Sequence, residues 1–153
     1  NEDKSKAFFD VFFAPPPDES YVPDYVYKKP KEQYREITDE QIYRVIGKTS
    51  LYKATGPDDI SNSVFTHCAD ELVPFIGKLF RATFRLQYYP DCWKEYATVV
   101  LRKAGKPDYG LAKAYRPITL LNALAKILSA CVAEDVSYMA EKHQMPPSRH
   151  FGG

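Results

Sequence analysis

Apolar residues recur at helical spacing in several separate stretches of this chain, and polar or proline-rich segments lie between them. Near the N-terminus, four phenylalanines within residues 4–14 would form one apolar stripe of a short helix. Thr38 stands three residues before Gln41, which is the spacing of a capping box, and apolar positions follow at 42–46. The pattern therefore predicts a second helix that starts after Thr38 and has Gly47 as its C-cap.

Three further helices are expected over 61–70, 72–89 and 122–141, after a loop at 51–57. Pro74 would lie in the first turn of the helix over 72–89, where proline is tolerated, and Asn122 is the expected N-cap of the last helix. The helix over 72–89 has a broad apolar face and is expected to be deeply packed through Leu72, Phe75, Ile76, Leu79, Phe80, Thr83, Phe84 and Leu86.

Two short segments have the pattern of strands instead. Residues 96–101 are the best strand candidate in the chain, and residues 115–121 fit its hairpin partner across a polar loop at 104–114. Pro117 would be at an edge or at the start of the second strand, because it has no backbone N–H to donate. The predicted fold class is an α-rich α+β fold, with several helices and one small β-hairpin.

The segment over 15–31 is rich in proline and is expected to be an extended arm. A linker on the protein surface is favoured over a ligand for a peptide-binding domain, because no P-x-x-P core supports the ligand. The tyrosines of this arm, at 21, 25 and 27, are expected to pack beneath it rather than to stack on nucleic acid.

Composition bounds the class of protein. A chain of 153 residues with 44% hydrophobic and 27% charged residues can bury a core. No apolar run approaches the roughly 18 residues needed to span a bilayer, and no signal peptide is expected at the start of the chain. Three cysteines without a C-x-x-C pair argue against a disulfide framework or structural zinc and favour a reducing compartment. The start at Asn1 and the end in a loop suggest a piece of a longer protein.

The net charge of +1 argues by itself against a nucleic-acid binder, but it is a cancellation between segments. Residues 1–50 carry 8 positive and 10 negative side chains, 51–92 carry 4 and 5, 93–127 carry 7 and 2, and 128–153 carry 2 and 3. The predicted hairpin therefore lies in a segment of net charge +5. Charge alone leaves two alternatives open: a solvated basic loop, or a site for phosphates.

Catalytic and metal-binding patterns are not found. The string Gly47-Lys48-Thr49 lacks the earlier glycine of a phosphate-binding loop, and there is no G-x-S-x-G elbow. The histidines at 67, 143 and 150 have no ligand partners at metal spacing, and the His67-Cys68 pair is expected to pack. Asp58-Asp59 is expected to serve a turn and a helix N-cap.

Trp93, the single tryptophan, is expected to anchor the core, with stacking on a nucleic-acid base as the weaker alternative.

A series of short motifs, in a fixed order, carries a family resemblance. They are Ala54-Thr55-Gly56-Pro57-Asp58-Asp59-Ile60, Trp93, Ala97-Thr98-Val99-Val100-Leu101-Arg102-Lys103, Gly105-Lys106-Pro107, Tyr115-Arg116-Pro117-Ile118-Thr119-Leu120-Leu121, Lys126-Ile127-Leu128 and Phe151-Gly152-Gly153. In this order they resemble the N-terminal part of reverse transcriptases of LINE-type (non-LTR) retrotransposons, and an element of fungal type is expected. The resemblance covers residues 51–153, and residues 1–50 match the variable linker that precedes this region.

The resemblance implies that residues 51–153 are the fingers and the start of the palm of an incomplete reverse transcriptase domain, truncated at the C-terminus. Lys103 and Arg116 match the fingers lysine and arginine that contact the triphosphate of the incoming nucleotide. Lys106 and Lys113 would be secondary phosphate or template contacts, with plain solvation an equal alternative, and Arg102 joins the expected binding set. The implied partners are an RNA or DNA template and a deoxynucleoside triphosphate.

The palm aspartates that bind two divalent metals, including the Tyr-x-Asp-Asp motif, are not in this sequence. We therefore expect no catalytic residue, no metal ligand and no cofactor in this chain, which should not polymerise DNA alone; magnesium is expected only in the intact polymerase. We expect no membrane association and an intracellular location, nuclear or cytoplasmic, and the oligomeric state is left open.

The chain departs from the family pattern at Asp59, Ala104, Ser129, Glu134-Asp135 and His150. The alternative function is a non-catalytic helical interaction module, or an inert retroelement remnant, that uses the phenylalanine stripe and the proline arm to bind a partner.

Overall fold

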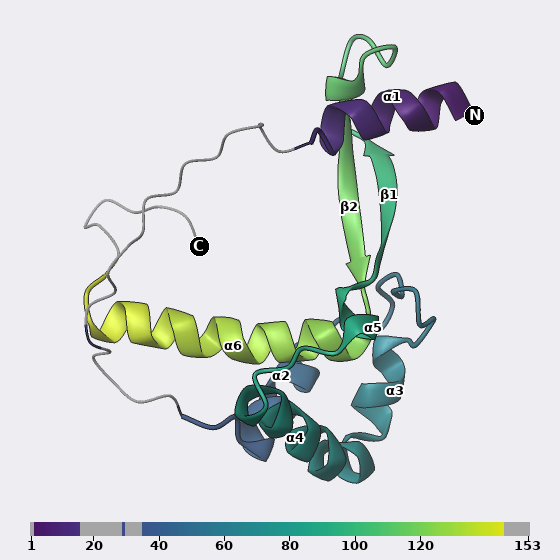
Figure 1. Cartoon of the computed structure of the whole chain (residues 1–153). Helices are drawn as coiled ribbons and strands as arrows, with labels where there is room; N and C mark the ends of the chain where they lie inside the picture. The colour runs from purple at the N-terminus through teal and green to yellow at the C-terminus, as the bar shows by residue number, and fades with distance from the viewer. Residues whose placement is uncertain (1, 16–28, 30–34, 146–153) are drawn as a thin grey trace. The chain divides into compact units, whose positions relative to one another are not determined.

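The computed structural model describes residues 2–15, 29 and 35–145. It divides them into two compact units, one that contains the described part of 1–34 with 98–119, and one that contains the described part of 35–97 with 120–153 (Figure 1). The predictions for the proline arm, its tyrosines, His150 and the Phe-Gly-Gly end lie outside the described residues.

The smaller unit contains helix α1 (Glu2–Phe12), most of a two-stranded antiparallel sheet and a short 3-10 turn, η1 (Ala112–Ala114). Strand β1 runs over Tyr96–Arg102 and β2 over Tyr115–Leu121, which confirms the predicted hairpin (Figure 1). Pro117 lies inside β2, and it is tolerated there because both strands of a two-stranded sheet are edges.

Helix α1 packs on the hairpin through only part of its predicted stripe. The ring of Phe8 meets the ring of Tyr115 edge-on at 4.8 Å, and Phe12 stacks on Phe8 at 5.9 Å. Both phenylalanines are half-buried, whereas Phe9 is 62% exposed and its ring lies 5.7 Å from that of Phe13, the residue after the helix. The helix is confirmed, but the single stripe divides into a packed pair and an exposed pair.

The larger unit is helical. Its helices are α2 (Asp39–Gly47), α3 (Asn62–His67), α4 (Ala69–Arg85), α5 (Asp91–Lys94) and α6 (Ala123–Lys142). Helix α2 lies at the centre of this unit and packs against α3, α4 and α6 (Figure 1). Its residues Ile42, Val45 and Ile46 are almost fully buried in a core formed with Phe65, Val73, Ile76, Phe80, Trp93, Ala123, Ala125, Ile127, Leu128 and Cys131.

The start of α2 confirms Thr38 as the N-cap of this helix. The Thr38 hydroxyl accepts a hydrogen bond from the Gln41 N–H at 3.1 Å. The side chain of Arg81 on α4 donates to the carbonyl of Ile37 and to Asp39, at 3.0 and 2.8 Å, which fastens the same end of α2 to α4. The helix ends one residue later than predicted, since Gly47 is still helical and Lys48 is the C-cap.

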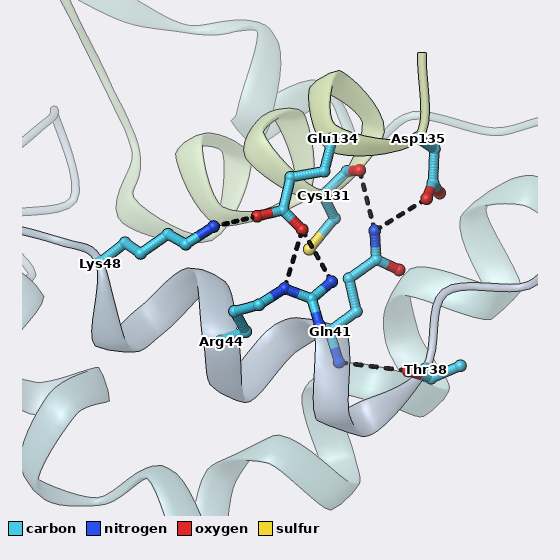
Figure 2. A network of polar contacts seen from close by, with 7 residues as sticks. All are labelled: Thr38, Gln41, Arg44, Lys48, Cys131, Glu134 and Asp135. Carbon is cyan, nitrogen blue, oxygen red and sulfur yellow. Dashed lines mark hydrogen bonds and ion pairs between the residues drawn. The ribbon is translucent and has the colours of Figure 1, made fainter. Parts of the chain in front are cut away.

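Polar side chains join α2 to α6 beside this core (Figure 2). The buried Gln41 amide donates to the carbonyl of Cys131 at 3.0 Å and to Asp135 at 3.1 Å. On the outer side, Glu134 pairs with Arg44 at 2.9 Å and with Lys48 at 2.7 Å. Glu134-Asp135, where the chain departs from the family pattern, therefore bonds to side chains of α2 and its C-cap.

This environment sets two pKa values. Hydrogen bonds from Arg44 and Lys48 lower the pKa of Glu134 below its usual value, because they favour the charged carboxylate. Burial, reinforced by Glu134 and Asp135, raises the pKa of the Cys131 thiol to about 11.

The turn at Gly56 confirms the predicted turn and shows the backbone at Asp59, one of the departures from the family pattern. Asp59 donates its N–H to the Gly56 carbonyl and has a φ of 52°, a left-handed conformation that favours glycine. The resemblance places a glycine at this position, so the aspartate occupies a backbone built for glycine. The N-cap prediction for Asp58-Asp59 is wrong, because α3 is capped by the Ser61 hydroxyl.

Helix α4 begins earlier than predicted. It starts at Ala69, after a break at Cys68, so Pro74 lies in the second turn instead of the first. The prediction that its whole apolar face is deeply packed is also wrong. Phe75 is 69% exposed and Leu86 72% exposed, and Leu79 is exposed as well. Periodicity identified an apolar helix, but the packed side is set by α2, which covers only one face of it.

Trp93 is 5% exposed and its ring meets Phe80 edge-on at 5.9 Å, which confirms it as a core anchor. Asn122 precedes α6 as predicted, but its amide donates to the Cys92 carbonyl at 2.7 Å and makes no capping hydrogen bond.

The packing role expected of His67-Cys68 is wrong, since both residues are exposed and His67 bonds the Ser63 carbonyl of its own helix. The predicted helix-rich α+β class, with one small hairpin, is confirmed.

Candidate nucleic-acid interface

The five predicted binding residues all lie on the hairpin, within the smaller unit. Arg102 ends β1, Arg116 is the second residue of β2, and Lys103, Lys106 and Lys113 belong to the connection between the strands. All are exposed except Lys103, which is half-buried. The hairpin elements therefore bring the predicted residues together on one supersecondary unit.

The pairing of the strands divides the cations between two faces. The N–H of Lys103 donates to the Ala114 carbonyl at 2.8 Å, which in an antiparallel ladder sets these two residues opposite each other. Continuing the ladder places Arg102 opposite Tyr115 and Leu101 opposite Arg116. Because side chains alternate along a strand, Lys103 and Arg116 share one face and Arg102 lies on the other.

Lys103 is held at three atoms. Besides its N–H bond to Ala114, its carbonyl accepts a hydrogen bond from the Tyr109 hydroxyl at 2.9 Å. Its ammonium donates to the Lys113 carbonyl at 3.1 Å. An ammonium has three N–H donors, so two donors of Lys103 remain for an anion.

The opposite face of the hairpin is aromatic. The guanidinium of Arg102 lies 5.2 Å from the ring centre of Tyr109, and that ring meets Tyr115 edge-on at 6.1 Å. The Tyr115 hydroxyl donates to the Tyr109 carbonyl at 3.0 Å. Arg102 is thus placed by ring contacts, apart from the face that Lys103 and Arg116 share.

Lys106 and Lys113 line a cavity of about 420 Å³ in the loop, together with Pro107, Asp108, Leu111 and Ala114. The loop turns through Gly105, whose φ of 71° favours glycine, and Asp108 accepts the Gly110 N–H at 2.7 Å. Lys103 and Arg116 do not line this cavity, although the Lys103 ammonium reaches the backbone carbonyl of Lys113.

The charge of the hairpin is not neutralised within the part of the chain that the structure describes. None of its five cations forms an ion pair with a described carboxylate, and Asp108 is the one acidic residue of the sequence over 96–121. The segment carries five positive side chains, so its net charge is +4. Several unpaired cations on one small element are able to bind a chain of phosphates.

Two residues of this site escaped prediction. Tyr109 and Tyr115 connect the loop to the strands through their hydroxyls, yet in the sequence each is a single tyrosine in a polar or strand-like context. The available signal was the presence of Tyr109 in a short polar loop, because an aromatic residue there needs a packing partner.

Outside the hairpin, the described residues contain an apolar cavity but no cluster that could hold a metal ion. Among residues 2–15, 29 and 35–145, no group of three or more histidine, cysteine, aspartate or glutamate side chains could hold a metal ion. No helix in the described ranges is both long enough and apolar enough to cross a membrane. In the helical unit, an apolar cavity of about 500 Å³ lies between the end of α4 and α6, lined by Thr83, Phe84, Gln87, Tyr88, Tyr89, Leu128, Ser129, Val132, Ala133 and Val136.

Comparison with known proteins finds relatives among retrotransposon polymerases. The chain is 32% identical over 112 residues to a probable RNA-directed DNA polymerase from transposon X-element of Drosophila melanogaster. It is 28% identical over 116 residues to the probable RNA-directed DNA polymerase from transposon BS, and 27% identical over 116 residues to that from the mobile element jockey, both of the same fly. No family model matches the chain.

These alignments cover 73% to 76% of this chain but only 12% to 13% of each relative, so the chain spans about one eighth of their length. The named relatives come from Drosophila, and the expected fungal-type origin stays a prediction. Over about three quarters of its length, the chain is a homologue of the RNA-directed DNA polymerases of LINE-type retrotransposons.

Proposed function

We propose that this chain is the fingers segment of a reverse transcriptase and that its hairpin contacts the template and the incoming nucleotide. The observation that carries the proposal is the set of five hairpin cations without a described carboxylate partner. The names of the relatives, which are RNA-directed DNA polymerases, supply the nucleic acid as the class of ligand.

The shared face of Lys103 and Arg116 suits a triphosphate. Phosphoryl transfer develops charge on the leaving phosphates, and fixed cations that neutralise it lower the barrier. The arginine can bind two phosphate oxygens at once, while the lysine supplies a compact charge with two free donors. The loop lysines at 106 and 113 would follow the sugar–phosphate backbone of the template, and Arg102 would contribute charge from the other face.

The chemical step itself lies outside this chain in our proposal. Two divalent metals are required for nucleotide addition, and the described residues contain no cluster of three or more histidine, cysteine, aspartate or glutamate side chains that could hold one. We therefore assign the hairpin to binding and positioning, and we expect no polymerase activity from the chain alone.

The proposal is tested by binding of a single-stranded RNA oligonucleotide to the double variant Lys103→Ala with Arg116→Ala. The variant loses two phosphate contacts and should bind about 10-fold or more weakly at low salt. Each lost contact should also reduce, by about 0.7, the slope of the logarithm of the binding constant against the logarithm of salt concentration. The matched control is Lys53→Ala with Lys78→Ala, which removes the same charge from two exposed lysines of the helical unit. Equal affinity losses in the two double variants would refute a specific role of the hairpin.

A second candidate function is a protein-interaction module. The observation that favours it is the exposed pair Phe9 and Phe13, in the last turn of α1 and directly after it, whose rings lie 5.7 Å apart. Phe9→Ser would then abolish association with a partner and leave RNA binding unchanged. Sedimentation of the chain with and without this substitution, at several concentrations, tests whether that surface associates at all.

A further inference from the structure

We propose that Tyr109 is a positioning residue that holds the Lys103 ammonium in place for phosphate, an inference that rests on the function proposed above. Tyr109 does not carry a charge and is not part of the motifs that define the family resemblance. Its role follows from where its hydroxyl lies.

The first step of the argument is the path of hydrogen bonds through the loop. Tyr115 donates to the carbonyl of Tyr109, and Tyr109 donates to the carbonyl of Lys103, at 3.0 and 2.9 Å. Both tyrosines are half-buried, and Tyr115 is packed against Phe8. The path therefore starts at a ring that α1 packs against and ends at the backbone of Lys103.

The second step is what this path fixes. The carbonyl of Lys103 faces the Tyr109 hydroxyl, while its N–H faces Ala114 and its ammonium reaches the carbonyl of Lys113. Because the Lys103 backbone is bonded on both sides and its ammonium is anchored on the Lys113 carbonyl, the side chain loses little further freedom when it binds an anion. Binding by a side chain already held in its bound geometry avoids the ordering cost that a free lysine carries.

The third step separates the hydroxyl from the ring. The Tyr109 ring also contacts the Arg102 guanidinium and Tyr115. Tyr109→Phe keeps these ring contacts and removes only the bond to Lys103. Tyr96→Phe is the matched control, because Tyr96 is an exposed tyrosine of β1 with no hydroxyl hydrogen bond in the described structure.

The test uses the full 153-residue chain and two measurements. The first is acylation of lysine amines by an N-hydroxysuccinimide ester, followed by mass spectrometry, with labelling of Lys103 expressed relative to Lys106. Loss of one neutral hydrogen bond should raise this ratio about fivefold in Tyr109→Phe and leave it unchanged in Tyr96→Phe. The second is affinity for single-stranded RNA, which should fall about threefold with an unchanged dependence on salt, since no phosphate contact is removed.

The outcomes distinguish a failure of the positioning role of Tyr109 from a failure of the proposed function. A raised Lys103 ratio together with weaker binding at an unchanged salt slope supports the positioning role. An unchanged ratio overturns it, and so does a parallel rise at Lys103, Lys106 and Lys113 with a lower unfolding temperature, which would make Tyr109 a purely structural residue. If the unsubstituted chain fails to bind RNA at all, the proposed function is overturned whatever the labelling ratio shows.

Discussion

Replacement of Gly56 by alanine is the substitution that most sharply tests the packing of the helical unit. Gly56 is buried in the turn that precedes α3, and its backbone lies directly against the junction of β2 and α6. A Cβ built at Gly56 would meet the Leu121 carbonyl oxygen, and would lie 2.5 Å from the Leu121 carbonyl carbon and 2.6 Å from the Asn122 nitrogen. All three atoms belong to backbone, which cannot rotate away as the end of a side chain can.

The magnitude follows from that geometry. Ordinary contacts of a Cβ begin at 3.4 Å, so the two segments would have to separate by nearly 1 Å. Overpacking of this kind costs about 1–3 kcal/mol, and the backbone neighbours place Gly56→Ala at about 2–3 kcal/mol. For a chain of this size, that loss lowers the unfolding temperature by about 5–10 °C.

Urea unfolding followed by the fluorescence of Trp93, the single tryptophan, measures the effect within the same core. Gly47→Ala is the matched control, because a Cβ at Gly47 meets nothing within 4 Å and alanine favours the end of α2. We expect the control to be neutral or up to about 1 kcal/mol more stable. Equal stability of Gly56→Ala and the unsubstituted chain would refute the close approach of the turn to the junction.

Three further predictions concern charge and the thiols. Glu134→Gln should lower the free energy of unfolding at pH 7 by about 1 kcal/mol, because two partly exposed ion pairs are lost. The pKa of Glu134 is lowered in the folded state, so its contribution is present above the unfolded value of about 4.3 and is lost as the pH falls through the folded value. The urea midpoints of the two proteins should therefore converge once the pH is below the folded value. A gap that persists there would contradict the pairing. Iodoacetamide at pH 8 should modify the exposed Cys68 and Cys92 in the native chain and spare Cys131, whose pKa is about 11, until the chain unfolds. Mass spectrometry of the labelled peptides measures the modification of each thiol. Rapid labelling of Cys131 in the native chain would argue against the buried α2–α6 contact. Arg81→Ala should cost about 1–2 kcal/mol in the same urea assay, because Asp39 and the Ile37 carbonyl lose a common donor, and Arg85→Ala at an exposed pair should cost less than half as much.

Local signals predicted the elements well. The Thr38 cap, the two strands and Trp93 as a core residue depend on short-range patterns, and the structure confirms each of them. The exposed face of α4 could not be predicted in the same way. Periodicity shows that Phe75 and Leu79 belong to an apolar helix, but which face is covered depends on partners distant in sequence.

The close packing that requires a glycine at position 56 could not be predicted from the sequence either. Its motif indicated a turn, which is correct, but the tighter requirement comes from Leu121 and Asn122, more than 60 residues later. The beginning of α4 was also misplaced, because the predicted helix over 72–89 put Pro74 in its first turn, whereas the helix starts at Ala69.

The charge of the candidate site could be predicted from the sequence, but the arrangement of its side chains could not. Counting charges by segment locates the basic hairpin, because cationic side chains of one loop stay together in any fold. The division of the cations between two faces follows from the strand register, and the hydrogen bond from Tyr109 to Lys103 follows from the loop path. The roles of the five cations stay predictions.

The dependence of RNA binding on salt tests the central claim most directly. If the hairpin cations neutralise phosphates of a single strand, the logarithm of the binding constant should fall with the logarithm of salt concentration at a slope between about −2 and −3.5, the upper magnitude corresponding to all five cations. Removal of Lys103 and Arg116 should reduce the magnitude of that slope by about 1.4, and removal of Lys53 and Lys78 should not change it. A slope near zero in the unsubstituted chain, or the same slope in both double variants, would contradict the account.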